Sequence, residues 1–208
     1  MTSWCWILVC YLSIAFLTLL PVLKAWRGPI VLNPGGPSFD ASSSFSDEAK
    51  TRLSQNFERL KGTLGFWKHE ATKYERTHIY CMLWLILLSV SVPVLTQVTS
   101  VYGGDDPFAS IFLTVTTTHV ALVTSIHQFF KVQQNFKAFR LGESEFYDTY
   151  RRLLDSPASF GKNEAEQLTS YFDQVSVIRR SVRSAETDTY AGLEEIRRGQ
   201  ANRQTPMD

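Results

Sequence analysis

Residues 79–130 read IYCMLWLILLSVSVPVLTQVTSVY (79–102), GGDDP (103–107) and FASIFLTVTTTHVALVTSIHQFF (108–130). The two arms of this stretch, residues 79–101 and 108–130, have 23 residues each and contain no Asp, Glu, Lys or Arg. As helices rising 1.5 Å per residue, each would be roughly 35 Å long, enough to cross the hydrocarbon core of a bilayer. The short turn between the arms forces them to run antiparallel. The sequence therefore predicts a transmembrane helical hairpin.

The basic residues are distributed unevenly around this hairpin. Nine of the 21 Lys and Arg residues lie between positions 24 and 76, and the other twelve lie between positions 131 and 203. The turn has none and carries Asp105 and Asp106 instead. Because cytoplasmic flanks of membrane helices are enriched in Lys and Arg, we expect both flanks to be cytoplasmic and the turn to be external.

A third apolar block, residues 3–23, lies near the N-terminus and has no charged residue. The first basic residues, Lys24 and Arg27, follow this block, which favours a transmembrane anchor over residues 1–27 with its N-terminus outside. A helix lying on the membrane surface and a cleaved leader are the alternatives, although no small-residue cleavage site follows. Residues 28–45 are rich in Pro, Gly and Ser, which predicts a flexible linker.

Helical periodicity begins again after this linker. Ser46 is a suitable N-cap, and two acidic residues follow it in the first turn. Apolar residues then recur every three or four positions, which predicts a cytoplasmic helix over residues 46–78 that continues into the hairpin. This heptad seam consists of Leu53, Phe57, Leu60, Leu64, Trp67, Ala71, Tyr74 and His78. Pro93, inside the first arm, is the predicted hinge, because proline frees a helical carbonyl.

The second arm carries a stripe of small and polar residues along one side of the expected helix. We interpret these residues as candidate pore-lining positions: Thr114, Thr117, Thr118, Ala121, Ser125 and Gln128. Such a stripe can also serve close packing between membrane helices, and both readings stay open. In a pore, Asp105 and Asp106 would form the outer mouth and favour cations. His119 is a candidate pH-sensitive group, with a neutral packing histidine as the alternative.

Residues 131–198 predict two further cytoplasmic helices, separated by a break over residues 155–161. Asn163 is the expected N-cap of the second helix, with Glu166 completing a capping box. These helices carry apolar seams that suit packing on each other or on other copies of the chain. Residues 199–208 are expected to be disordered. The fold class is thus an all-α membrane protein, with a transmembrane hairpin, an N-terminal transmembrane helix and a cytoplasmic, coiled-coil-like helical domain.

Catalytic and ligand-binding motifs are absent from the sequence. It contains no phosphate-binding glycine loop, no HExxH and no G-x-S-x-G, so we expect neither enzymatic activity nor a cofactor. The three cysteines lie in apolar blocks without ligand spacing, so no metal site is expected either. The near-neutral net charge of +1 does not suggest a nucleic-acid partner, and none is expected.

A family resemblance adds to this interpretation. The charged helix that enters the first arm (FWKHEATKYERTHIYCMLWL), the SVPVL segment, the polar second arm and the segment FKAFRLGESEFYDTYRRLLD together resemble the SLATT superfamily. The resemblance covers about residues 47–193 and assigns a SLATT-like domain to residues 46–198. It implies two membrane helices, so the N-terminal apolar block departs from the pattern.

The resemblance also implies a function. SLATT domains are regarded as membrane effectors of bacterial nucleotide-signalling conflict systems, in antiphage defence or cell suicide. We therefore expect a homo-oligomeric pore or membrane-disrupting protein of the cell inner membrane, with its C-terminus in the cytoplasm. Its expected partners are the lipid bilayer, other copies of itself and a nucleotide-signalling sensor protein or second messenger. The alternative is a membrane-anchored scaffold that recruits a cytoplasmic partner through its C-terminal helices.

Overall fold

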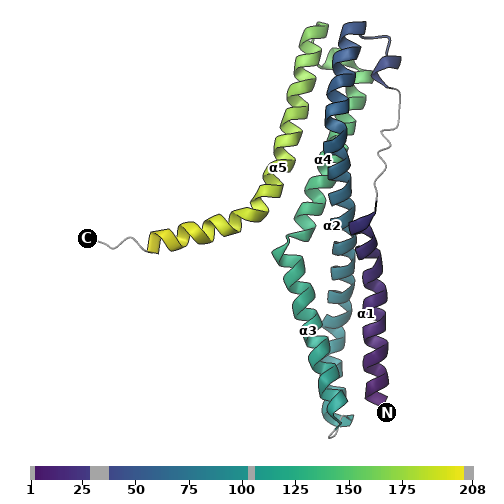
Figure 1. Ribbon diagram of the computed structural model, residues 1–208, viewed down its shortest axis with the longest axis vertical. Helices are drawn as coiled ribbons and strands as arrows, with labels where there is room; N and C mark the ends of the chain where they lie inside the picture. Colours follow the sequence, from purple (N-terminus) through teal and green to yellow (C-terminus); the bar gives the residue numbers. More distant parts are fainter. Residues whose placement is uncertain (1–2, 29–37, 103–105, 204–208) are drawn as a thin grey trace, which may run out of the picture. The chain divides into compact units, whose positions relative to one another are not determined.

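The computed structural model describes residues 3–28, 38–102 and 106–203, with side chains as far as Glu186. Within these residues the chain is helical and has no strand, which confirms the all-α prediction. The α-helices are α1 (Ser3–Arg27), α2 (Asp47–Tyr102), α3 (Pro107–Phe129), α4 (Val132–Asp155) and α5 (Glu164–Arg203), shown in Figure 1. Two short 3-10 helices, η1 (Phe39–Ala41) and η2 (Pro157–Ser159), complete the described elements.

Three of these helices, α1, α2 and α3, are long and apolar enough to cross a membrane. The helix α2 runs without interruption from Asp47 to Tyr102, as the continuous periodicity predicts. The described residues form two compact units, and α2 contributes to both. The first unit comprises Met1–Pro29 and Thr72–Gln133, and the second comprises Ile30–Ala71 and Gln134–Asp208.

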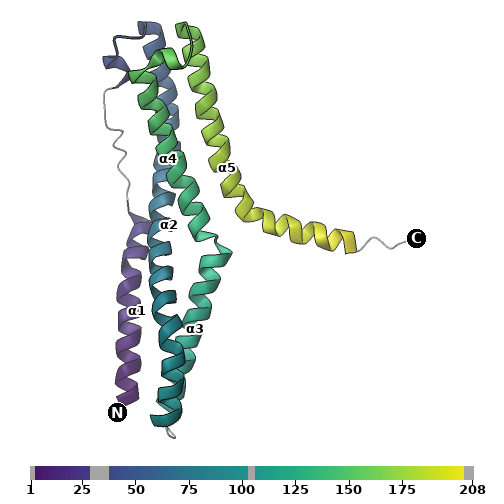
Figure 2. The ribbon, with the colours of Figure 1, turned by 180° about the vertical axis from the view of Figure 1, so that it is seen from behind.

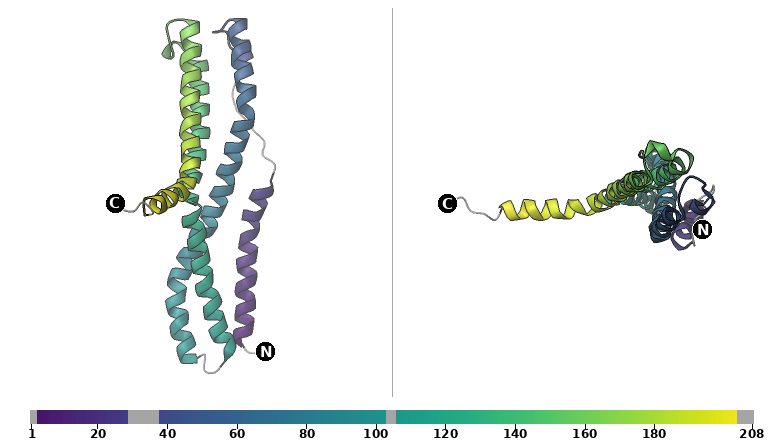
Figure 3. Two further views of the ribbon diagram at one scale, coloured as in Figure 1. Left: turned by 60° about the vertical axis from the view of Figure 1, so that its left-hand side comes forward. Right: turned by 90° about the horizontal axis from the view of Figure 1, so that it is seen from above.

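In the first unit, α1 and α3 run parallel to each other and antiparallel to the apolar part of α2. Contacts along α1 establish these directions. Near the middle of α1, Thr18 meets Trp84 of α2, and at its end Trp26 meets Lys73 of α2. The left view of Figure 3 shows α1 beside the paired α2 and α3. The predicted antiparallel hairpin is therefore present, and α1 packs on it as a third helix.

The core of the first unit is small and rich in aromatic residues. Cys81, Trp84, Leu88 and Val123 are buried at its centre. Many large apolar side chains of α1 and α2 instead point outward, among them Phe16, which is 59% exposed. A soluble protein rarely exposes so much contiguous apolar surface, whereas lipid covers such a surface in a membrane. These helices therefore fit a membrane protein.

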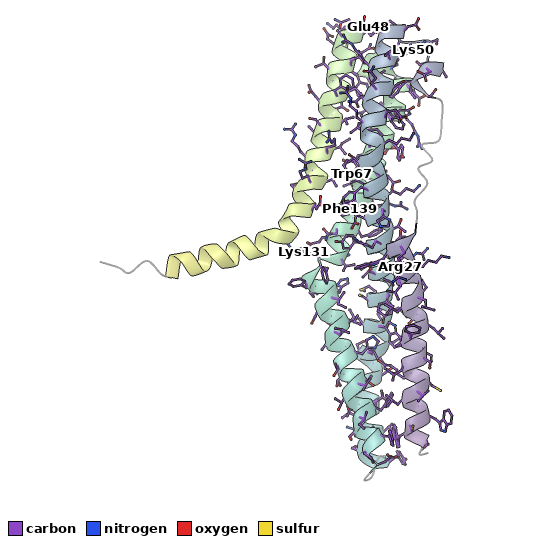
Figure 4. All side chains as sticks on the ribbon, in the orientation of Figure 1. Arg27, Glu48, Lys50, Trp67, Lys131 and Phe139 are labelled. Atoms are coloured by element: carbon purple, nitrogen blue, oxygen red, sulfur yellow. The ribbon has the colours of Figure 1, made fainter. Side chains whose placement is uncertain are left out.

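The second unit packs the beginning of α2 against α4 and α5, whose pairing is visible in Figure 2. The predicted seam of α2 forms much of its core, with Leu53, Leu60, Leu64, Trp67 and Ala71 all buried. The facing helices contribute buried apolar residues at the same spacing: Phe139, Phe146, Tyr150, Leu153, Leu168, Val175, Ile178 and Val182. Trp67 and Phe139 are labelled in Figure 4.

The burial of these seams distinguishes between the two packings expected from the sequence. Their periodicity suits packing on each other or on other copies of the chain, and in the structure they are buried within a single chain. Burial of apolar area is the main favourable term in folding, and these side chains are already removed from water. Any contact between copies through the second unit must therefore use other residues.

Both predicted helix starts are confirmed by their hydrogen bonds. The Ser46 hydroxyl oxygen accepts a hydrogen bond of 3.3 Å from the amide of Ala49. The Asn163 side chain accepts a hydrogen bond of 2.9 Å from the amide of Glu166, and the carboxylate of Glu166 accepts one of 2.9 Å from the amide of Lys162. These bonds satisfy amides that lack a partner inside the helix.

The linker and the tail differ from expectation where the structure describes them. Phe39 is 2% exposed and its ring centroid lies 4.5 Å from that of Tyr150, so the end of the predicted flexible linker packs onto the second unit. Residues 29–37 of that linker lie outside the described residues. The helix α5 continues to Arg203, past residue 199, at which the predicted tail begins. Residues 204–208 lie outside the described part of the chain.

A close helix approach holds α4 against α5. A Cβ atom added to Gly142 would lie 2.2 Å from a methyl carbon of Val182, which is shorter than any normal carbon contact. The absence of a side chain at Gly142 therefore allows the two helices to approach this closely. Elsewhere on α5, Tyr171 is fully buried, and burial raises the pKa of its phenol well above the ordinary value.

Candidate functional site

The polar stripe of α3 lies on the surface of the first unit. All six predicted pore-lining side chains are exposed in a single chain: Thr114, Thr117, Thr118, Ala121, Ser125 and Gln128. They do not pack against α1 or α2 of their own chain. Packing within the chain therefore does not explain the stripe, which is available to another copy, to water or to lipid.

Hydroxyls on this stripe are bonded to the backbone of their own helix. The side chain of Thr114 donates to the carbonyl of Ser110 at 2.9 Å, and that of Thr117 donates to the carbonyl of Leu113 at 3.0 Å. This back-bonding satisfies the donor without any partner on a neighbouring helix. The hydroxyl oxygens still have acceptor capacity, so they can bind water or cations.

Thr116 differs from the threonines around it. It is fully buried, and its hydroxyl donates to the carbonyl of Phe112 at 2.6 Å. Thr116 is not among the site residues predicted from the sequence, because it stands in a run of three threonines. Its helical position gives the signal, since Thr116 falls on the same side of α3 as the buried Phe112 and Val123.

His119 also points away from the stripe and into the helix bundle. Its Nδ1 atom lies 2.5 Å from the hydroxyl oxygen of Tyr11, and its Nε2 atom lies 3.3 Å from the hydroxyl oxygen of Tyr80. A neutral imidazole has one N–H and one acceptor nitrogen, so one tyrosine accepts a hydrogen bond and the other donates one. His119 thus connects α1, α2 and α3 inside the predicted membrane region.

Aromatic rings surround this intramembrane polar network, which we define as Tyr11, Tyr80 and His119. The ring centroid of Trp84 lies 4.8 Å from that of His119, and its indole N–H donates to the hydroxyl of Thr18 at 3.1 Å. The site residues predicted from the sequence do not include Tyr11, Tyr80, Trp84 or Thr18. A signal was available, because polar groups inside apolar spans require partners there, but periodicity does not say which residues pair.

A pair of histidines lies where α2 and α3 leave the apolar region. His78 Nδ1 lies 3.1 Å from His127 Nε2, and the two rings are stacked with centroids 5.3 Å apart. One neutral imidazole can donate its N–H to the acceptor nitrogen of the other. Among the described residues there is no group of three or more His, Cys, Asp or Glu side chains that could hold a metal ion.

The remaining predicted site residues lie on α2 and at the turn. Asp106 is the N-cap of α3, and its side chain accepts a hydrogen bond of 3.0 Å from the amide of Phe108. Asp105, the other predicted mouth residue, lies outside the described residues. Pro93 is exposed, and α2 continues through it to Tyr102.

The charges of the first unit are separated between its two ends. Arg27 and Lys131 lie at one end (Figure 4), where the indole ring of Trp26 also lies 5.2 Å from the amine of Lys73. Asp106 lies at the opposite end, where α3 begins. This separation agrees with the pattern of basic residues seen in the sequence.

The geometry of the first unit therefore gives α3 two different faces. The inward face holds the helices together through Thr116, His119 and Val123, while the outward face presents the polar stripe. Comparison of the chain with protein-family models, curated proteins and solved structures gives no match.

Proposed function

We propose that this protein is an oligomeric membrane effector that forms a pore in the cell inner membrane. The observation that carries the proposal is the exposed polar stripe of α3, on a helix that is long and apolar enough to span a bilayer. A single three-helix unit cannot enclose a channel. Several copies arranged with their α3 stripes facing a common axis would line a water-filled path with hydroxyl groups.

The inward network supports this role for α3. Because α1 and α2 cover the side of α3 that carries His119 and Thr116, they leave the opposite side open. In the proposed assembly, α1 and α2 face lipid with their exposed apolar side chains. Asp106, at the start of α3, then contributes negative charge to the outer mouth and favours cations.

The proposed orientation follows from the charged ends of the first unit. Basic residues favour the cytoplasmic side, which places Arg27 and Lys131 in the cytoplasm and Asp106 outside. The second unit is then cytoplasmic, where it can respond to a nucleotide-signalling sensor protein or a second messenger. The resemblance to SLATT domains supports antiphage defence or conflict-triggered cell suicide as the biological setting.

The test is ion or dye release from liposomes that contain the purified full-length protein. Thr118→Leu and Ser125→Leu place apolar side chains on the stripe and are expected to lower conductance several-fold without changing the number of copies. Thr96→Leu is the matched control, because Thr96 lies in the spanning part of α2 and its hydroxyl is bonded to a backbone carbonyl, as are those of Thr114 and Thr117 on the stripe. Assembled, correctly inserted protein that never releases ions under any trigger would refute the proposal.

The scaffold alternative makes a different prediction for the membrane helices. If the protein only recruits a cytoplasmic partner, an unrelated hairpin can replace residues 79–130 without loss of activity in cells. The pore proposal predicts complete loss in the same exchange. The assay is growth arrest or membrane depolarisation in cells that express each form at equal levels.

A further inference from the structure

The second unit contains an open groove between α4 and α5, with a volume of about 1050 Å³. We define the acidic groove by the carboxylates of Glu145, Asp148, Glu166 and Asp173, which line it. Its floor is apolar and includes Phe160 and Ile178, both buried. Val177, which also lines the groove, is 56% exposed.

The charge of this groove is strongly one-sided. Arg152 is the single basic residue among its lining residues. The guanidinium of Arg152 is already engaged, because it donates to the side chain of Gln174 at 2.6 Å and lies 5.1 Å from the ring centroid of Phe160. Four carboxylates beside one engaged arginine attract a cationic partner. The apolar floor favours a cation on a side chain that also has aliphatic carbons.

A cationic surface with aliphatic carbons is present on α5. We define the arginine ridge as Arg179, Arg180 and Arg183, which are all exposed on α5. Arg180 folds back onto its own helix and donates to the hydroxyl of Ser176 at 3.2 Å, an exposed contact that is easily exchanged. Arginine matches carboxylates in planar, paired hydrogen bonds, and its methylene groups cover apolar surface.

We propose that the acidic groove of one copy receives the arginine ridge of a second copy. The ridge and the groove of one chain cannot meet, because the ridge lies on the same continuous helix, α5, that forms one wall of the groove. At 100° per residue, Arg179 and Arg183 lie about 160° and about 120° around α5 from Val177, whereas Arg180 lies about 60° away, and all three lie toward the C-terminal end. The centre of the ridge is therefore on a different side of α5 from the groove and can engage a different neighbour.

Docking of the ridge of one copy into the groove of the next determines how copies assemble. The role given to that assembly rests on the proposed pore function. A contact between two different surfaces is head-to-tail, and its repetition closes into a ring when the rotation per copy allows. A ring is the arrangement that brings several α3 stripes around one axis. The groove and ridge thus supply a surface between copies in place of the seams, which are buried within each chain.

The experiment uses the full-length protein in detergent and measures the number of copies by native mass spectrometry over a range of concentrations. A groove variant combines Asp148→Lys with Asp173→Lys, and a ridge variant combines Arg179→Glu with Arg180→Glu. Each variant is expected to weaken self-association at least about tenfold, because like charges then meet across the contact. Glu58→Lys and Arg59→Glu are the controls, since both positions are exposed on α2 outside groove and ridge.

The decisive sample is an equal mixture of the two variants. In the mixture the unchanged ridge of the groove variant meets the unchanged groove of the ridge variant, and the reversed charges of the changed groove and the changed ridge are also opposite. Complexes that contain both variants are therefore expected. Circular dichroism verifies that both variants are folded. The inference is overturned if wild-type protein stays a single copy at every concentration, if the variants assemble like wild type, or if the folded variants do not pair.

The liposome assay separates this inference from the proposed function. If wild-type protein assembles through the groove but never conducts, the pore proposal fails and the docking surface stands. If the groove variant still assembles and conducts like wild type, the docking surface fails and the pore proposal stands.

Discussion

Gly142→Ala is expected to destabilise the packing of α4 on α5, although alanine usually stabilises a helix relative to glycine. The added Cβ would lie 2.2 Å from a methyl carbon of Val182 and 3.6 Å from a ring carbon of Trp67. Carbon atoms pack at about 3.5–4.0 Å, so the methyl group of Val182 must retreat by more than 1 Å. Valine in a helix has one strongly preferred rotamer, and Val182 is only 4% exposed, so α4 and α5 must separate.

The net effect combines two opposing terms. Overpacking of this kind costs about 1–3 kcal/mol, whereas replacing glycine with alanine inside a helix contributes about 1 kcal/mol. Gly142→Ala should therefore lower the local stability of α4 and α5 by up to about 2 kcal/mol. Gly62→Ala is the matched control, because a Cβ at Gly62 would have no neighbour within 4 Å, and it should raise stability by about 1 kcal/mol.

The assay is hydrogen–deuterium exchange of the full-length protein in detergent, followed at peptides from α4 and α5. Val182→Ala removes the clashing methyl group and costs about 1–2 kcal/mol by itself, from the lost burial of two carbon groups. In the double variant the clash is gone, so the combined cost should be smaller than the sum of the two single costs by the overpacking cost, about 1–3 kcal/mol. Additivity within about 0.5 kcal/mol, or a stabilising Gly142→Ala, would refute the close helix approach.

Three further predictions concern other described residues. Tyr171→Phe should raise stability by about 1 kcal/mol in thermal unfolding, because the buried Tyr171 hydroxyl has no hydrogen-bond partner among the described residues. Since burial raises the pKa of Tyr171 above its ordinary value of 10.0, the folded protein retains this phenol proton longer than the unfolded chain. The free energy of unfolding should therefore fall as pH rises above about 10. Tyr171→Phe should make this dependence on pH less steep by about 1.4 kcal/mol per pH unit. An unchanged dependence would contradict the raised pKa of Tyr171. Asn163→Ala should cost about 1 kcal/mol and increase amide exchange in the first turn of α5, while equal exchange would show that the cap is dispensable. His119→Leu should loosen the packing of α1 on the other two helices. Maleimide labelling of the buried Cys5, measured in a Cys10→Ser background, should therefore accelerate at least several-fold. A labelling rate equal to that of the same background with His119 intact would contradict the role of the network.

Local features of this fold were well predicted from the sequence. The caps at Ser46 and Asn163 depend on residues within four positions of one another, and the apolar spans depend on composition alone. The seam of α2 follows helical periodicity, which correctly identifies which side is buried. These features needed no knowledge of which helix packs against which.

The packing partners were harder to predict, for physical reasons. A heptad seam looks the same whether it packs on its own chain or on another copy, so Leu53 and Leu60 carry no information about that choice. Tyr11 and His119 are separated by 108 positions, and no local pattern links them. Gly142 resembles any other glycine in a helix until the position of Val182 is known.

The back-bonded hydroxyls of α3 bear on how the protein enters the membrane during synthesis. Each chain emerges into the bilayer alone, before any second copy is beside it. Because Thr114 and Thr117 satisfy their hydroxyl groups on their own backbone, a solitary α3 can tolerate contact with acyl chains. Under the pore proposal, newly made copies can therefore diffuse separately without conducting ions. Cell damage would then begin only when enough of them meet, so the local density of the protein becomes the variable that a host must control.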